Sequence, residues 1–146
     1  VILVNKWDLL DKSTETAKKA EEQIKKKIAP FTDVPIVFVS ALEKQRLLKG
    51  LETAIQVHKN RTQKIATSVL NEVMLPLIGH HPPPATKGKY IQIKYCMQLP
   101  TETPTFVFFA NLPQYIKEPY MRYIENQLRE HFDFSGVPIQ IYFRKK

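Results

Sequence analysis

Two short apolar runs, each ending in a polar motif, constrain this chain more than any other feature. Residues 1–4 lead into Asn5-Lys6-Trp7-Asp8, and residues 35–39 lead into Ser40-Ala41-Leu42. Such runs are typical of strands buried on both faces of a parallel sheet. Because a helix-length polar segment separates them, we expect two parallel strands joined by a helix. Both polar motifs would then lie at the carboxyl ends of the strands, where open α/β sheets bind ligands.

The first polar motif has the chemistry to recognise a guanine base. Asp8 can accept hydrogen bonds from the ring N–H and the exocyclic amine together, and a charged acceptor facing paired donors makes a strong, specific contact. Asn5 can bond the base and brace a neighbouring loop, while the aliphatic stem of Lys6 can lie along the purine face. The alternative is an ordinary strand-to-helix loop in which Asp8 or Asp11 caps the next helix.

The pair of motifs resembles the last third of a P-loop GTPase domain, in which Asn-Lys-x-Asp is followed, one helix and one strand later, by Ser-Ala-x. The resemblance implies that the backbone N–H of Ala41 meets the guanine O6. It also implies contact with GTP or GDP by seven residues: Asn5, Lys6, Trp7, Asp8, Ser40, Ala41 and Leu42. The sequence contains no G-x-x-x-x-G-K-[ST] to hold phosphates. We therefore expect a fragment with no catalytic residue, metal site or bound cofactor of its own, whose parent holds Mg²⁺ elsewhere.

Helical patterns flank the expected boundary between two domains, residues 1–59 and 60–146. A helix running to about His58 would bury a stripe of apolar side chains: Leu47, Leu51, Ala54 and Ile55. A new helix is expected from Asn60, with Gly79 as its C-terminal cap. After it come strands near residues 90–98 and 106–110, a helical turn at 113–116, a helix from Pro119, and a last strand over 139–144. This αββααβ order is that of a type II KH fold.

Alternation along the expected strands divides their residues between two faces. On the first strand, one face would carry Ile91, Ile93, Tyr95 and Met97, and the other Gln92, Lys94, Cys96 and Gln98. The solvated face of the sheet would then show Gln92, Lys94, Gln140, Tyr142 and Arg144. Such groups can bind RNA, and they are equally ordinary on a solvated sheet. Both interpretations stay open, with three candidate RNA or protein contacts: Lys94, Tyr142 and Arg144.

Composition indicates what kind of partner and which cellular compartment suit this chain. The formal net charge of +8 favours a polyanionic partner. The single cysteine, Cys96, excludes an internal disulfide and suggests a buried thiol in a cytoplasmic protein. The apolar runs are too short to span a membrane. His80 and His81 have no Cys or acidic residue near them in the sequence, so we expect a solvated pair and no metal site.

Several motifs in one order resemble the C-terminal part of the bacterial double GTPases of the EngA (Der) family. These motifs are Asn5-Lys6-Trp7-Asp8-Leu9, Ser40-Ala41-Leu42, His81-Pro82-Pro83-Pro84, Lys87-Gly88-Lys89, Tyr123-Ile124-Glu125-Asn126 and Gly136-Val137-Pro138-Ile139-Gln140-Ile141. The resemblance implies that residues 1–59 end the second GTPase domain and that residues 60–146 form a KH-like domain. It also implies that the parent binds GTP with Mg²⁺ and acts on the large ribosomal subunit, with rRNA and its own upstream GTPase domains as partners.

The sequence departs from RNA-gripping KH domains at the junction between the two adjacent helices. Where those domains have G-x-x-G, this chain has Ile116-Lys117-Glu118-Pro119. Glu118 would repel a phosphate and Pro119 lacks an N–H, so we expect contacts with protein as much as with rRNA. The alternative function is a stand-alone KH-type RNA-binding module with no nucleotide role. Because the strand at residues 1–4 lacks at least one of the two neighbours that a central strand pairs with, we also expect self-association through residues 1–40.

Overall fold

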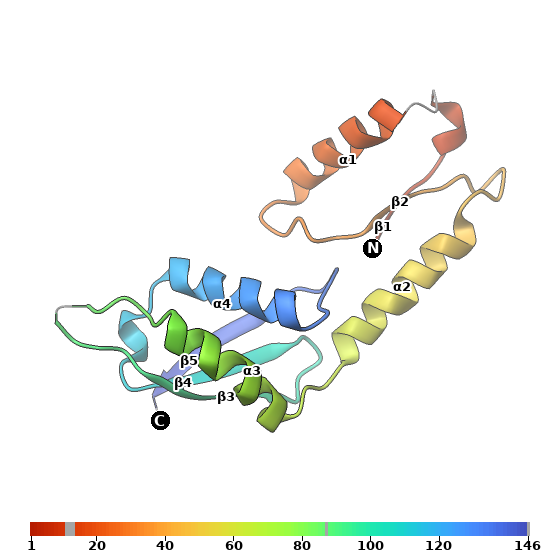
Figure 1. Ribbon diagram of the computed structural model, residues 1–146. Helices are drawn as coiled ribbons and strands as arrows, with labels where there is room; N and C mark the ends of the chain where they lie inside the picture. The colour runs from red at the N-terminus through yellow and green to blue at the C-terminus, as the bar shows by residue number, and fades with distance from the viewer. Residues whose placement is uncertain (11–13, 87, 146) are drawn as a thin grey trace. The chain divides into compact units, whose positions relative to one another are not determined.

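The computed structural model describes residues 1–10, 14–86 and 88–145, which form two compact units. The first unit comprises Val1–Asn60 with Ser135–Val137, and the second comprises Arg61–Phe134 with Pro138–Lys146. Each unit contains its own sheet, with two strands in the first and three in the second (Figure 1).

The first unit is built on a parallel pair of strands, β1 (Ile2–Val4) and β2 (Ile36–Phe38). Leu3 lies opposite Val37, so the two strands run in register and end at the same edge. The 3-10 helix η1 (Trp7–Leu9) follows β1, and helix α1 (Thr14–Ile28) connects it to β2. The expected parallel strands joined by a helix are therefore confirmed.

Helix α2 (Leu47–Thr62) extends further than its sequence pattern indicated. The prediction of a new helix from Asn60 is wrong, because residues 60–62 end α2 and the next helix begins only at Thr67. Between the two helices, the Ile65 N–H donates to Gln98 Oε1 at 2.8 Å and Gln98 Nε2 donates to the Gln63 carbonyl at 3.1 Å. These long-range bonds engage backbone groups that a continuous helix would pair internally.

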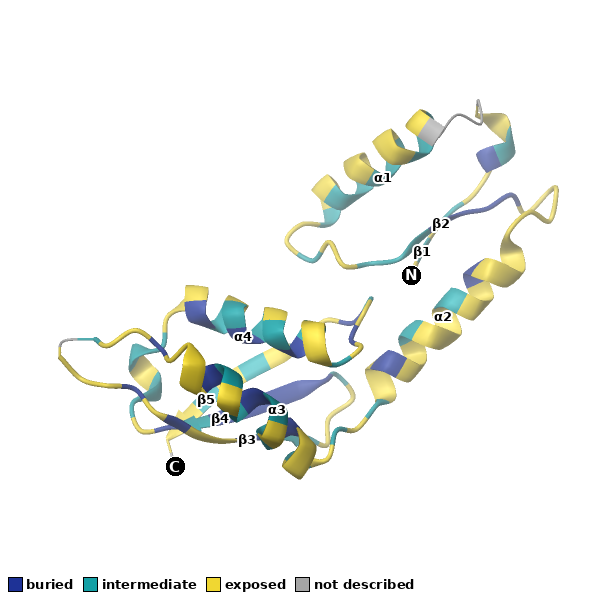
Figure 2. Cartoon of the chain, viewed as in Figure 1, coloured by how far each residue is buried: buried dark blue, intermediate teal, exposed yellow. Residues whose placement is uncertain are grey.

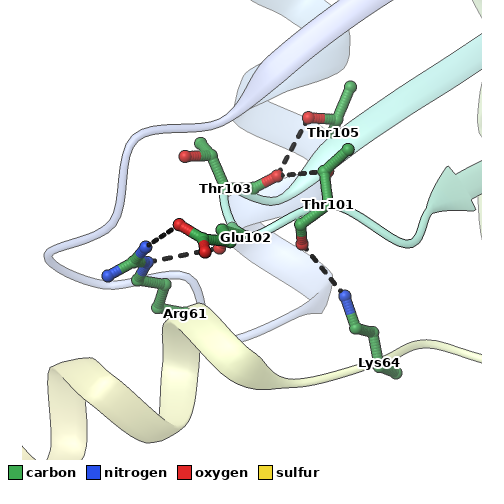
Figure 3. Close-up of polar contacts among 6 residues, drawn as sticks. All are labelled: Arg61, Lys64, Thr101, Glu102, Thr103 and Thr105. Atoms are coloured by element: carbon green, nitrogen blue, oxygen red, sulfur yellow. Dashed lines mark hydrogen bonds and ion pairs between the residues drawn. The ribbon is translucent and has the colours of Figure 1, made fainter.

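Arg61 at the end of α2 and Lys64 just after it both bond the loop at residues 100–104 (Figure 3). The guanidinium of Arg61 lies 3.3 Å from the Glu102 carboxylate and donates to the Glu102 carbonyl at 3.2 Å. Lys64 Nζ donates to the Thr101 carbonyl at 3.1 Å. Within the loop, the hydroxyls of Thr101 and Thr105 both donate to the Thr103 carbonyl.

The apolar stripe expected to be buried on α2 is exposed instead (Figure 2). Leu51 is 59% exposed and Ile55 is 47% exposed. The prediction is wrong for this chain because a sheet of two short strands offers little surface to cover a helix of 16 residues. Contact is close at Gly50, where an added Cβ would lie 3.0 Å from a methyl carbon of Leu3.

The second unit shows the predicted order of helix, strand, strand, short helix, helix and strand. Its elements are α3 (Thr67–His80), β3 (Ile93–Leu99), β4 (Thr105–Ala110), η2 (Pro113–Tyr115), α4 (Glu118–His131) and β5 (Gln140–Lys145). Strand β4 is central, antiparallel to β3 and parallel to β5. The prediction of Gly79 as the C-terminal cap is wrong, because Gly79 lies inside α3 and the cap is His81, two residues later.

Helices α3 and α4 pack on one face of this sheet and enclose the core of the unit (Figure 1). The fully buried side chains include Leu70 and Met74 on α3, Ile124 and Leu128 on α4, and Phe106 and Phe108 on β4. Tyr120, which did not stand out in the sequence, is also buried and donates its hydroxyl to the His81 carbonyl at 2.9 Å. Burial raises the pKa of the Tyr120 phenol above its usual range.

An irregularity in β3 overturns the predicted division of its faces. Ile93 pairs with Ala110, but Tyr95 pairs with Phe109, so β3 advances two residues while β4 advances one. Lys94 is the extra residue of this bulge. Beyond it Cys96 faces the core at 0% exposure, whereas Tyr95 is 40% exposed on the outer face. The strict alternation predicted from Ile91 to Met97 is therefore wrong after Ile93.

The amide of Asn71 on α3 completes the outer edge of β3 at Cys96. Asn71 Nδ2 donates to the Cys96 carbonyl at 2.7 Å, and the Cys96 N–H donates to Asn71 Oδ1 at 2.9 Å. The side chain thus replaces a neighbouring strand at this position and discourages pairing with another chain. Burial raises the pKa of the Cys96 thiol to about 12, which keeps it protonated at neutral pH.

Candidate functional site

The structure brings the two sequence motifs together at the carboxyl ends of β1 and β2. Val39 N–H donates to the Val4 carbonyl at 2.8 Å, and Trp7 N–H donates to the Val39 carbonyl at 3.1 Å. Beyond these backbone bonds, the Ala41 N–H donates to Asn5 Oδ1 at 3.0 Å. The side chain of Asn5 therefore braces the neighbouring loop, as predicted, and joins positions 36 residues apart.

Lys6 turns the chain sharply between β1 and η1. Its φ of 62° lies in the left-handed region, which non-glycine residues seldom adopt. The turn ends the extended strand and begins the 3-10 helix that carries Asp8. Strained residues of this kind cluster at functional sites, where the surrounding structure holds them in place.

Trp7 anchors this turn from inside the first unit. Its side chain is 6% exposed, and its ring centroid lies 4.2 Å from that of Phe38 on β2. The indole therefore stabilises the loop through packing, and only its neighbours in the motif offer surface to a ligand. Asn5 and Lys6 are exposed and Asp8 is half-buried. Asp11, the alternative capping residue, lies outside the described residues.

Ser40 shapes the second half of the site. Its side chain is 1% exposed, and its hydroxyl accepts from the Glu43 N–H at 3.2 Å. Ser40 and Gln45 also exchange two backbone hydrogen bonds, of 3.2 and 2.9 Å. Leu42, by contrast, is 86% exposed at the tip of the resulting loop.

Two features of this loop were not predicted from the sequence. The Ala41 N–H, expected to face a ligand oxygen, is engaged by Asn5 instead. Lys44 and Arg46 both have left-handed backbone, with φ of 55° and 56°. Neither is a glycine, asparagine or aspartate, so no residue type marked these positions as turns.

The three candidate contacts of the second unit do not share one environment. Tyr142 and Arg144 are exposed and project from the same face of β5, which is the face turned away from the core. Lys94, at the bulge, borders a groove of about 400 Å³ whose other walls include Ile78, Pro83 and Ile91. The predicted grouping of all three on one regular sheet face is therefore wrong for Lys94.

The junction at residues 116–119 has the geometry of a helix start. Lys117 is the extended N-terminal flanking residue of α4, and its carbonyl accepts from the Tyr120 N–H at 3.0 Å. Glu118 forms an ion pair with Arg122 one turn later. A carboxylate at a helix N-terminus is favourable for the helix and unfavourable for a bound phosphate.

The described residues lack two further features, a metal-binding cluster and a membrane-spanning helix. The described residues contain no group of three or more His, Cys, Asp or Glu arranged to hold a metal ion. His81 instead packs its ring 4.7 Å from that of Tyr123. In the same part of the chain, no helix combines the length and apolar character that a membrane span requires.

Comparisons with known proteins identify relatives for the whole chain. The family model for the KH-domain-like region of EngA bacterial GTPase enzymes, C-terminal, matches residues 64–144. The protein called GTPase Der in Flavobacterium johnsoniae is 66% identical over all 146 residues, which are 33% of its length. GTPase Der of Christiangramia forsetii and of Porphyromonas gingivalis are 62% and 58% identical, again over 100% of this chain and 34% of each relative. The chain thus spans about a third of the length of the curated relatives it matches.

Proposed function

Because this chain belongs to the EngA family of bacterial GTPases, we propose that it is the C-terminal part of a GTP-binding ribosome-assembly factor. In this proposal residues 1–59 end a GTPase domain and residues 60–146 form a KH-like domain of type II order. The parent protein, in this proposal, is a protein of the relatives' length that contains this chain. The parent acts in the cytoplasm on the large ribosomal subunit.

We propose that the carboxyl ends of β1 and β2 bind the guanine base. The observation that carries this proposal is the 3.0 Å hydrogen bond from Ala41 to Asn5, which couples the two motifs at one edge of the sheet. Since Asn5 Oδ1 accepts that bond, its Nδ2 is the atom left to donate to a purine acceptor. Asp8 accepts from the ring N–H and the exocyclic amine, and the Lys6 stem covers the ring face.

The phosphates and Mg²⁺ of a bound nucleotide belong, in this proposal, to other parts of the parent protein. GTP supplies the phosphoanhydride bond for hydrolysis, whereas the residues of this chain bind and orient the base. The sequence contains no glycine-rich phosphate loop, so the chain contributes selectivity for the base rather than hydrolysis.

Comparison of nucleotides that differ at one group tests the guanine site. In the parent protein, inosine diphosphate should bind about ten- to a hundredfold more weakly than GDP, because inosine lacks the amine that donates to the Asp8 carboxylate. Competition against a fluorescent GDP analogue measures both affinities, with ADP as the reference for a base that does not fit. Equal binding of the inosine and guanosine nucleotides would contradict the assignment.

The KH-like domain is proposed to contact rRNA and protein through its sheet rather than through a glycine loop. The Glu118–Arg122 pair and the missing N–H of Pro119 disfavour a phosphate at the helix junction. Lys94, Tyr142 and Arg144 remain the proposed contacts, and all three are exposed.

We also propose that the apolar surface of the first unit is covered by other GTPase segments in the parent protein. Leu3 and Leu48 are 54% and 76% exposed, and uncovered apolar strands and helices favour association. The isolated 146-residue chain should therefore self-associate as its concentration rises, and L3E together with L48E should suppress the effect. Sedimentation equilibrium measures this, and a monomer at every concentration would contradict it.

A further inference from the structure

The bulge at Lys94 creates a surface on the second unit that the sequence pattern concealed. Beyond the bulge, Tyr95 pairs with Phe109, which in turn pairs with Arg144 on β5. Directly paired residues of neighbouring strands project from the same face of a sheet. Tyr95, Phe109 and Arg144 therefore form one row across all three strands, on the face opposite the core helices.

A second row lies beside the first on the same face. It consists of Met97, Val107 and Tyr142, which also occupy directly paired positions. Tyr95 and Tyr142 are 40% and 48% exposed at the two edge strands, and Val107 is 1% exposed at the centre. The ring centroids of Tyr95 and Phe109 lie 5.8 Å apart. The outer face thus presents exposed aromatic rings on its two edge strands, beside a central strand whose Val107 side chain is buried. These two rows are called the outer platform below.

The charged residues within the three strands have one sign. They are Lys94 on β3 and Arg144 and Lys145 on β5, and none of the three strands contains an Asp or Glu. Three of the acidic residues elsewhere in the second unit, Glu102, Glu118 and Glu125, are paired with arginines. A surface that joins exposed aromatic rings to exposed cations complements a chain of unstacked bases and phosphates.

We propose that the outer platform binds a short unpaired stretch of RNA. Two inter-strand spacings give the row about 10 Å of width, which is room for two or three stacked bases. In this arrangement bases stack on Tyr95 and Tyr142, and the guanidinium of Arg144 contacts a phosphate. The inference rests on the proposed rRNA contact of the KH-like domain and specifies the kind of RNA bound. Exposed rings on a sheet face can stack with unpaired bases, whereas the bases of a duplex are not accessible for stacking.

Fluorescence anisotropy on the complete 146-residue chain tests the outer platform. The probe is a fluorescein-labelled single strand of RNA, about twelve nucleotides long, compared with the same strand in a duplex. Y95A should weaken single-strand binding by about tenfold, whereas Y95F should retain it, because either ring can stack. R144A should weaken binding and lower the salt slope by about 0.7, the value for one lost phosphate contact on a single strand. Y90A is the matched control, since Tyr90 is 82% exposed but lies outside the strands.

The outcomes separate this inference from the function on which it rests. Equal losses for Y95A and Y90A, or equal binding of single strand and duplex, would overturn the outer platform while leaving an rRNA contact elsewhere in the domain. If the chain binds neither the single strand nor the duplex at low salt, both the outer platform and the proposed rRNA contact are contradicted. The proposal would also be overturned if Y95A abolished the binding of a protein partner and left RNA binding unchanged. Thermal unfolding midpoints of the variants distinguish lost contacts from lost folding.

Discussion

Replacement of Asp8 by Asn in the parent protein should abolish its preference for guanine nucleotides. The carboxylate accepts from two base donors, and an amide offers one acceptor and one donor in its place. The new Nδ2 donor would face the exocyclic amine of guanine, so one bond is lost and two donors meet. The affinity for GDP should fall by roughly 10²- to 10⁴-fold, the range expected when a built hydrogen-bonding site meets a mismatched group.

The same substitution should create a preference for xanthine nucleotides. Xanthine has a carbonyl where guanine has the amine, so the Asn Nδ2 would donate to it while Oδ1 still accepts from the ring N–H. Competition assays with GDP and xanthosine diphosphate measure both changes. E43Q is the matched control, because Glu43 is an exposed acid in the adjoining loop whose carboxylate bonds only Gln45 among the described residues. Weak binding of both nucleotides by D8N would indicate a structural role for Asp8 and contradict base recognition.

Replacement of Phe106 by Ala should remove a large part of the stability of the second unit. Phe106 is fully buried in β4 and its ring meets that of Phe134 edge-on at 5.5 Å between centroids. Truncation of such a ring leaves a cavity and costs about 3–5 kcal/mol. Because a domain of this size is stable by about 5–15 kcal/mol, F106A should shift the denaturant midpoint strongly or leave the unit unfolded.

The neighbouring aromatic residues of β4 supply the control for this prediction. Phe109 is half-buried on the opposite face of the same strand, within the outer platform. F109A should therefore destabilise the unit much less than F106A, although it removes the same ring. Urea unfolding followed by circular dichroism gives both free energies of unfolding. Equal losses for the two variants would show that the two faces of the sheet are buried alike and would contradict the register.

Local patterns predicted those features that depend on neighbouring residues along the chain. The apolar runs at residues 1–4 and 35–39, each followed by a polar motif, predicted a parallel pair of strands ending at one edge. Helical and alternating periods predicted the order of elements in the second unit. The bracing of a neighbouring loop by Asn5 followed from the chemistry of its amide.

Tertiary contacts decided what the periodic patterns could not determine. The extra residue Lys94 in β3 reverses the faces of Tyr95 and Cys96, and the bulge exists only in relation to the partner strand β4. Residues 60–62 remain in α2, and Gln98, 35 positions from Gln63, bonds the backbone that follows. The stripe on α2 is exposed because burial depends on what the rest of the structure can cover. The sequence alone thus determined which segments form helices or strands and which polar motifs follow the strands of the first unit. Both features depend on residues that are close together in the chain. Only the tertiary structure decided which side chains face solvent, because register and burial are properties of paired elements.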